Sequence, residues 1–301
     1  MKTMNTNIAG IKMKNPVMNA SGTLGLGFGD CFDLSKCGAL VTKGVTLLPR
    51  SGNSTPRIAE ATSVLLNSIG LENSGVKVFL AEELSVWLSF GVPVIVNISG
   101  ADLQEYVDLA VALEGHGIAG FEINVSCPNR EGVIFGTDPE LASNVTDAVR
   151  QVTDLPLIVK LTPNVTSIKA VAQAVVEAGA DAISAVNTFL GMVIDVKTRR
   201  PKLGKGFGGV SGPGIRPLAV KKVREIYEAV NDQVPIIGMG GIDSTEAALE
   251  FIIAGASAVA VGTANFTNPR TIPEVIEGLE RYLEEQGLES LEEIRGRIIP
   301  V

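Results

Sequence analysis

Residues 155–188 read LPLIVKLTPNVTSIKAVAQAVVEAGADAISAVNT, and this stretch decides the fold. Two apolar runs, Leu155–Leu161 and Ala182–Thr188, flank a segment whose apolar residues recur at i, i+3, i+4, i+7 and i+8 between Ile168 and Val176. This period predicts an amphipathic helix, and Gly179 suits the left-handed position that follows a last helical turn. The unbroken apolar runs predict strands covered on both faces, as in a parallel sheet. The stretch therefore predicts a strand–helix–strand unit.

The same alternation continues in both directions along the chain. Six further apolar runs complete a series of eight predicted strands: PVMNAS (Pro16–Ser21), ALVTKGV (Ala39–Val45), PVIVNIS (Pro93–Ser99), GFEINVS (Gly120–Ser126), VPIIGMG (Val234–Gly240) and AVAVGTA (Ala258–Ala264). Each run is followed by a helical pattern, as between Ile215 and Val230. Eight such units without a linker predict a (β/α)8 TIM barrel, an α/β fold, as one domain over residues 1–301. A doubly wound sheet is the alternative, but no G-x-G-x-x-G follows the first predicted strand.

Two segments are longer than a simple connection. Thr46–Asn73 is predicted to be a long loop region. Residues 189–209 are predicted to be an insertion that forms a hairpin, with Val193–Thr198 as one strand and Arg199–Lys202 as the turn. Long insertions at the C-terminal face of a barrel tend to build the active site, so we expect both segments to form active-site loops.

Composition narrows the classes of function. The 301 residues carry 25 Lys and Arg against 33 Asp and Glu, a net charge of −8, which disfavours a nucleic-acid partner. Apolar stretches are interrupted well before the ~18 residues of a membrane span, and the N-terminus lacks the apolar core of a signal peptide. Three cysteines are too few for a disulfide framework, and no metal-site spacing is found. We expect a soluble, cytoplasmic protein with no membrane partner and no metal.

Polar residues at the ends of the predicted strands indicate a site, because the carboxyl ends of barrel strands surround one mouth. These residues are Ser21, Lys43, Asn97, Asn124, Lys160 and Asn187. An asparagine at such a place is often only a turn former. Lys43 and Lys160 lie inside apolar runs, where we expect them to be largely buried. Each lysine indicates either a structural ion pair or a bound anion or reducible ring.

The last two predicted strands end in small residues that suit a phosphate. Gly240–Gly241 and Gly262–Thr263 offer backbone N–H groups, and a helix predicted to start at Ser244 adds positive potential. Loops after the seventh and eighth strands commonly bind phosphate in barrels. Plain turns are the alternative, but the whole set favours a phosphorylated ligand. FMN fits, because a lysine beneath a flavin stabilises its anionic reduced ring.

The most specific local string is N-V-S-C-P-N, from Asn124 to Asn129. Cys127 follows a strand end and precedes a proline, so we expect its thiol to face the site. Cys31 and Cys37 are expected to be inert, and His116, the only histidine, is expected at the surface. Without a histidine or a carboxylate pair at a strand end, a hydrolase or a glycosidase is disfavoured.

Several motifs together resemble the dihydroorotate dehydrogenase family, flavin enzymes of pyrimidine biosynthesis. They are N-A-S-G-T, T-K-G-V, N-S-I-G-L-E-N, N-V-S-C-P-N and G-F-G-G-V-S-G-P, and the resemblance covers essentially the whole chain. Thr42–Arg57 is most similar to the class 1B branch, whose catalytic subunit pairs with an iron–sulfur flavoprotein and uses NAD. Cys127 stands where the membrane-bound class 2 enzymes have serine, and no N-terminal extension is present, so class 1 is implied.

The resemblance implies a role for individual residues. Cys127 would be the base that takes the C5 proton of (S)-dihydroorotate, while the C6 hydride goes to N5 of FMN. The substrate would be held by Lys43, Asn67, Ser68, Ile69, Gly70, Leu71, Asn124, Asn129, Asn187 and Thr188. FMN would contact Ser21, Lys43, Gly44, Asn97, Asn124, Lys160, Val186, Gly212, Gly240, Gly241, Gly262 and Thr263. A cysteine, with an ordinary pKa of about 8.5, suits proton abstraction at neutral to mildly alkaline pH.

The resemblance also implies partners. It predicts a homodimeric core within a heterotetramer, joined to a subunit that carries FAD and a [2Fe–2S] cluster. NAD has no evident site in this chain, because no dinucleotide fingerprint follows a strand. Three alternatives stay open: a class 1A homodimer that reduces fumarate, a related flavin barrel that acts on uracil or thymine, and a sugar-phosphate isomerase or aldolase barrel without flavin. A non-enzymatic binding module is disfavoured by the polar strand ends.

Overall fold

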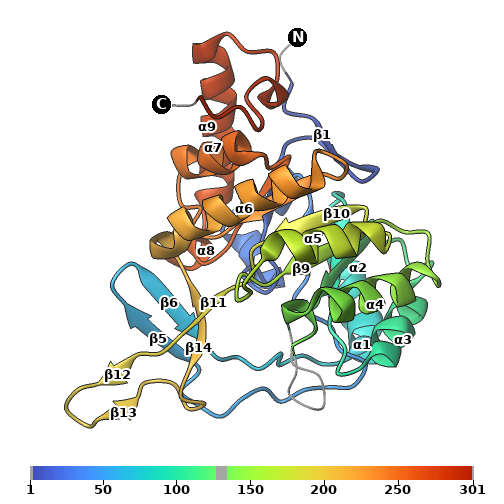
Figure 1. Cartoon of the computed structure of the whole chain (residues 1–301), viewed down its shortest axis with the longest axis vertical. Helices are drawn as coiled ribbons and strands as arrows, with labels where there is room; N and C mark the ends of the chain where they lie inside the picture. Colours follow the sequence, from blue (N-terminus) through green and yellow to red (C-terminus); the bar gives the residue numbers. More distant parts are fainter. Residues whose placement is uncertain (1–2, 127–133, 300–301) are drawn as a thin grey trace.

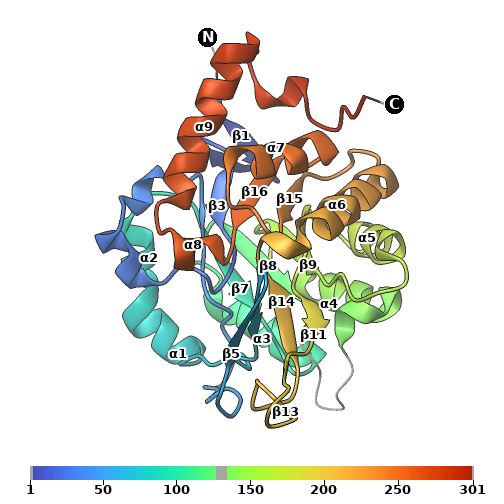
Figure 2. The ribbon, with the colours of Figure 1, turned by 90° about the vertical axis from the view of Figure 1, so that its left-hand side faces the viewer.

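The computed structural model describes residues 3–126 and 134–299, and within them eight parallel strands form a barrel (Figure 1, Figure 2). Their order around the sheet is β3, β16, β15, β10, β9, β8, β7 and β4. The bounds are β3 (Val17–Asn19), β4 (Leu40–Val41), β7 (Val94–Ile98), β8 (Gly120–Asn124), β9 (Leu157–Leu161), β10 (Ala182–Ala185), β15 (Ile236–Met239) and β16 (Ala258–Val261). Each predicted apolar run contains one of these strands, so the predicted TIM barrel is confirmed.

Helices cover the outside of the barrel (Figure 2). They are α1 (Val76–Val78), α2 (Leu84–Ser89), α3 (Leu103–Leu113), α4 (Pro139–Arg150), α5 (Ile168–Glu177), α6 (Arg216–Val230), α7 (Thr245–Ala254), α8 (Ala264–Thr267) and α9 (Thr271–Gln286), and a π-helical turn (Phe79–Glu83) joins α1 to α2. The apolar stripe of α5 is buried as its period predicts. Gly179 and Gly255 take positive φ just past α5 and α7, and Ser244 caps α7. No helix in the described ranges is long and apolar enough to cross a membrane.

One predicted helix is absent. Between β3 and β4 the described chain forms only short 3-10 helices, Leu26–Asp30 and Leu34–Lys36, rather than the α-helix that the alternation predicts. The sequence GTLGLGFGD explains the difference, because repeated glycines lower helix stability by about 1 kcal/mol each relative to alanine.

The interior of the barrel is filled from its amino-terminal end. The hairpin of β1 (Thr6–Ile8) and β2 (Ile11–Met13) places Ile8, Ile11 and Met13 in one buried cluster with Met18 and with inward-facing residues of the barrel strands. A separate, larger apolar cluster lies between the strands and the helices. The hairpin therefore closes one end of the barrel, and the polar residues lie toward the other.

A small antiparallel sheet stands over that other end (Figure 1). Its order is β11, β14, β6, β5, with bounds β11 (Phe189–Gly191), β14 (Gly208–Ser211), β6 (Val64–Asn67) and β5 (Ile58–Ala61). The prediction that Thr46–Asn73 is only loop is wrong, because it contains β5 and β6. These two strands turn at Ser63, whose φ is +60°, and β6 pairs with β14 of the distant insertion, a contact that local sequence does not specify.

The predicted hairpin within the insertion forms, but with other boundaries. Its strands are β12 (Ile194–Asp195) and β13 (Arg200–Pro201), so Val193–Thr198 is not one strand and Arg199–Lys202 is not the turn. The turn comes earlier because Asp195 Oδ1 accepts hydrogen bonds from the backbone N–H groups of Lys197 and Thr198. An aspartate that bonds its own following backbone is a turn former.

The barrel closes between β3 and β4 with the help of a side chain. Backbone pairing there is limited to a single bridge, Met18 to Ala39. Beyond it, Asn19 Oδ1 accepts a hydrogen bond from Val41 N at 2.9 Å, and Asn19 Nδ2 donates to Val41 O at 2.8 Å. All these atoms belong to buried residues. The Asn19 amide thus replaces one rung of the ladder.

We expect Asn19→Ala to lower the free energy of unfolding by about 2–4 kcal/mol, because it leaves two buried backbone groups of Val41 without partners. Urea unfolding measured by circular dichroism checks this. The matched control is Asn144→Ala on the exposed face of α4, which we expect to change stability by less than about 0.5 kcal/mol. Equal stabilities of the two variants would contradict the role of Asn19.

Candidate active site

A cavity of about 330 Å³ opens at the carboxyl ends of the strands, beneath the small sheet. Its volume lies at the lower end of the range of small-molecule and cofactor sites. All twelve residues predicted to contact FMN line it: Ser21, Lys43, Gly44, Asn97, Asn124, Lys160, Val186, Gly212, Gly240, Gly241, Gly262 and Thr263. Asn67, Ile69, Gly70, Leu71, Asn187 and Thr188 of the predicted substrate set line it too. Residues far apart in the sequence therefore surround one space.

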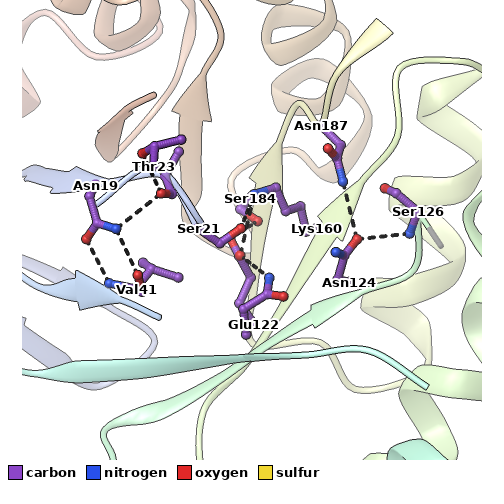
Figure 3. Close-up of polar contacts among 12 residues, drawn as sticks. Asn19, Ser21, Thr23, Val41, Glu122, Asn124, Ser126, Lys160, Ser184 and Asn187 are labelled. Carbon is purple, nitrogen blue, oxygen red and sulfur yellow. Dashed lines mark hydrogen bonds and ion pairs between the residues drawn. The ribbon is translucent and has the colours of Figure 1, made fainter. Parts of the chain in front are cut away.

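A buried ionic network forms the floor of the cavity (Figure 3). Lys160 Nζ lies 3.6 Å from Glu122 Oε2 and 2.9 Å from Ser21 Oγ, and the side chains of Lys160 and Glu122 are only 6% and 3% exposed. Ser184 Oγ donates to Glu122 Oε1 at 2.8 Å. Lys160 is thus buried as predicted. The two interpretations of this lysine are compatible, because it makes a structural ion pair and also lines the cavity.

Lys43 differs from Lys160, and the prediction that it is largely buried is wrong. Its strand β4 already ends at Val41, so the Lys43 side chain leaves the apolar interior and is exposed at the cavity. In the described ranges no carboxylate lies within ion-pair distance of its amine. Lys43 therefore offers a positive charge to an anion that enters the cavity.

Two asparagines, Asn124 at the end of β8 and Asn187 just past the end of β10, are linked beside this network. Asn124 Oδ1 accepts hydrogen bonds from Asn187 Nδ2 and from Ser126 N, each at 3.2 Å (Figure 3). On the small sheet, Asn67 Nδ2 is 3.5 Å from Gly209 O. Amides carry both donors and acceptors, so together these side chains suit a ring with carbonyl and N–H groups.

The glycine pairs form a cradle of backbone N–H groups. Gly241, Gly262 and Thr263 have backbone N–H groups for which the described chain provides no acceptor. Gly241 has a φ of +80°, and a Cβ there would lie 2.8 Å from Gly212 O, so this position requires glycine. A Cβ on Gly262 would meet only Ala20 Cβ, at 3.9 Å, so space remains above it. Such unpartnered N–H groups suit a phosphate.

A loop that precedes β5 supports the segment of residues 67–71. Arg57 Nε donates to Asn53 O at 2.6 Å, and Asn53 Nδ2 donates to Ser68 Oγ at 2.9 Å. Ser68 is buried and is not among the residues that line the cavity. The other residues of the segment 67–71 line the cavity, whereas Ser68 anchors the segment through its hydrogen bond with Asn53.

The predicted base falls in a part of the chain that carries no structural description. Cys127 and Asn129 lie outside the described residues, so their predicted roles stay predictions. Cys37 is buried, and burial raises the pKa of its thiol to about 12, which fits the prediction that it is inert. Cys31 and His116 are exposed. Among described residues no group of histidine, cysteine and acidic side chains could hold a metal ion.

Sequence reasoning missed several residues of the site. Glu122 is the most consequential, and its signal was a charged residue inside the apolar run GFEINVS, as in the case of Lys160. Ser184 gave no such signal. Nine further residues line the cavity without having been predicted: Ala20, Gly22, Ile58, Leu65, Ser211, Ile215, Met239, Ala260 and Phe266.

Comparison with known proteins agrees with this arrangement. The family model described as "Dihydroorotate dehydrogenase" matches residues 3–283. A protein of Pelobacter propionicus is 50% identical over 300 residues, with 98% of both chains covered. One of Geotalea uraniireducens is 49% identical over 301 residues, also with 98% of both covered, and one of Desulforudis audaxviator is 51% identical over 294 residues, with 96% of this chain and 95% of the relative covered. Each is named "Dihydroorotate dehydrogenase B (NAD(+)), catalytic subunit".

Alanine substitutions at two glycines separate folding from ligand binding. In Gly262→Ala the methyl group enters open cavity space, so we expect unchanged stability but about 10–100-fold weaker FMN binding, the equivalent of ~1–3 kcal/mol of crowding. In Gly241→Ala the strained φ and the contact with Gly212 O should lower stability by about 1–3 kcal/mol. Urea unfolding without ligand and fluorescence titration with FMN measure the two effects. Wild-type FMN affinity in Gly262→Ala would contradict the phosphate site.

Proposed function

The chain belongs to the dihydroorotate dehydrogenase family, and we propose that it is the catalytic subunit of an NAD-linked, class 1B enzyme that oxidises (S)-dihydroorotate to orotate in pyrimidine biosynthesis. The observation that carries the proposal is that an exposed lysine, a group of amides and a glycine cradle all line one cavity. A chain with three cysteines and no predicted disulfide suits a reducing compartment, so we propose a cytoplasmic location.

The described residues fit FMN. The N–H groups of Gly241, Gly262 and Thr263 would hold its phosphate, and Lys160 and Asn97 would face its ring. Asn97 Oδ1 is a buried acceptor without a partner in the described ranges, and the imide N–H of a flavin ring is a donor of the kind it lacks. When bound, FMN supplies a two-electron acceptor for the hydride at C6 of dihydroorotate.

The remaining residues have roles toward the substrate. The Lys43 ammonium group would neutralise the carboxylate of dihydroorotate, since it is exposed to the cavity and has no ion-pair partner in the described chain. Asn67, Asn124 and Asn187 would hold the amide-rich ring. We propose that the Cys127 thiolate takes the C5 proton, on the strength of the family motif N-V-S-C-P-N. Lys43 distinguishes this function from one on uracil or thymine, which carry no carboxylate.

Electrons must then leave the chain. The relatives are named catalytic subunits, which implies a second subunit in those proteins. We propose that this chain also has such a partner, that the partner carries FAD and a [2Fe–2S] cluster, and that two copies of this chain form the core of a heterotetramer. The absence of a dinucleotide fingerprint from the sequence supports a separate site for NAD.

We expect Cys127→Ser to retain FMN but to reduce it ~10²–10⁴-fold more slowly with dihydroorotate at neutral pH, the usual contribution of a general base. Part of the rate should return at high pH, because a hydroxyl loses its proton less readily than a thiol. Anaerobic stopped-flow measurement of flavin absorbance checks this, with Cys31→Ser at an exposed cysteine as the control. An unchanged rate at neutral pH would exclude Cys127 as the base.

With dihydroorotate as the electron donor, we expect the chain alone to reduce artificial dyes but not to reduce NAD. Addition of the partner subunit should restore NADH formation. An anaerobic steady-state assay with NAD as the sole acceptor measures this. Rapid NADH formation by the chain alone would refute the need for a partner. Efficient turnover with fumarate would indicate a class 1A enzyme, and purified protein without a flavin spectrum would indicate a barrel of another chemistry.

A further inference from the structure

Glu122 is a buried carboxylate to which the proposed reaction assigns no role. It lies on β8 inside the barrel, and side chains from three other strands contact it through two hydrogen bonds and one ion pair. Asn97 Nδ2 on β7 donates at 2.5 Å, Ser184 Oγ on β10 donates at 2.8 Å, and Lys160 Nζ on β9 lies at 3.6 Å. The register explains the convergence, because Asn97 is paired with Glu122 and Lys160 with Ser184 in adjacent parallel strands. The carboxylate is thus enclosed by its donors.

This contact fixes the orientation of the Asn97 side chain. An amide has a donor end and an acceptor end, whereas an ionised carboxylate only accepts. The NH2 group of Asn97 must therefore face Glu122, and Oδ1 must point away from it. Oδ1 is buried, has no partner in the described chain, and lies where a Cβ on Gly44 would approach it to 2.9 Å. Asn97 and Gly44 both line the cavity, so this unpartnered acceptor lies in the wall of the ligand space.

We propose that Glu122 is a positioning residue that sets the polarity of Asn97, so that the cavity presents an acceptor to the imide N3–H of the flavin ring. The proposal rests on FMN being the cofactor. Its physical basis is the free-energy cost of a buried donor without an acceptor, which disfavours the reversed amide as long as Glu122 is present. Without Glu122 both orientations become accessible, and the contact with N3–H is no longer enforced.

Two substitutions of Glu122 distinguish the effect of its acceptor oxygen on Asn97 from the effect of its negative charge. Glu122→Gln keeps an acceptor oxygen for Asn97 Nδ2, and its new N–H group can donate to Ser184 Oγ, since a hydroxyl also accepts. Glu122→Met fills similar space but accepts nothing. The matched control is Ser184→Ala, which removes a different donor to the same carboxylate and leaves the contact with Asn97 in place.

The experiment is NMR spectroscopy of each protein reconstituted with FMN labelled with ¹⁵N at N3, in which solvent exchange of the N3 proton reports its hydrogen bond. We expect slow exchange in the wild type, Glu122→Gln and Ser184→Ala, and exchange faster by about tenfold or more in Glu122→Met, the equivalent of about 1.4 kcal/mol. Exchange in Glu122→Met as slow as in the wild type would overturn the proposal. So would equally fast exchange in Glu122→Gln, because the charge and not the acceptor would then be responsible.

A double variant that removes the charges of both Glu122 and Lys160 controls for misfolding caused by a single unpaired buried charge. Glu122→Met with Lys160→Met leaves no unpaired buried charge, and replacement of a buried ion pair by apolar residues of similar size is often tolerated. We expect fast N3–H exchange in this double variant and slow exchange in Lys160→Met alone, which retains the carboxylate. The reverse result would overturn the proposal. If the wild type bound no FMN at all, the proposed function itself would fail, and the two failures are therefore distinguishable.

Discussion

The buried carboxylate of Glu122 is the constraint on which the floor of the cavity depends. A charge in an apolar interior costs several kcal/mol unless it is paired and hydrogen-bonded. Asn97, Ser184 and Lys160 meet that requirement from three other strands of the barrel, and Lys160 in turn contacts Ser21. The interactions that compensate the Glu122 charge therefore also fix the positions of Asn97, Lys160 and Ser21, which line the cavity (Figure 3). The same network thus serves both the stability of the barrel and the geometry of the proposed site.

Closure of the sheet brings this network together with the rest of the site. Strands that are adjacent only because the barrel closes contribute Ser21 after β3 and Lys43 after β4. The Asn19 amide completes that junction where backbone pairing stops. The site then has two parts of different origin: a floor built on barrel strands, and a roof built from the β5–β6 hairpin and the strand β14 that pairs with β6. Most residues predicted to contact the cofactor lie on the barrel strands or directly after them, and most of the predicted substrate contacts belong to the roof or its margins.

Lys43 and Lys160 show what a local sequence pattern predicts about a side chain and what it does not. Both stand in apolar runs of similar appearance, and both were expected to be buried. Lys160 lies within β9 and points into the barrel, whereas Lys43 lies two residues beyond the end of β4 and is exposed. Strand ends are poorly specified by local sequence. Here they decide whether a lysine forms an ion pair or offers its charge to a ligand.

The sequence by itself determined the barrel, because eight apolar runs and the helical periods between them depend only on local spacing. It also determined which residue types stand at the strand ends, and the motifs determined the family. Only the tertiary structure decided that Glu122 is the partner of Lys160, that Asn19 joins β3 to β4, and that β6 pairs with β14 across more than a hundred residues. These contacts join residues distant in the chain, and local periodicity carries no information about which distant groups satisfy a buried charge or an unpaired strand edge.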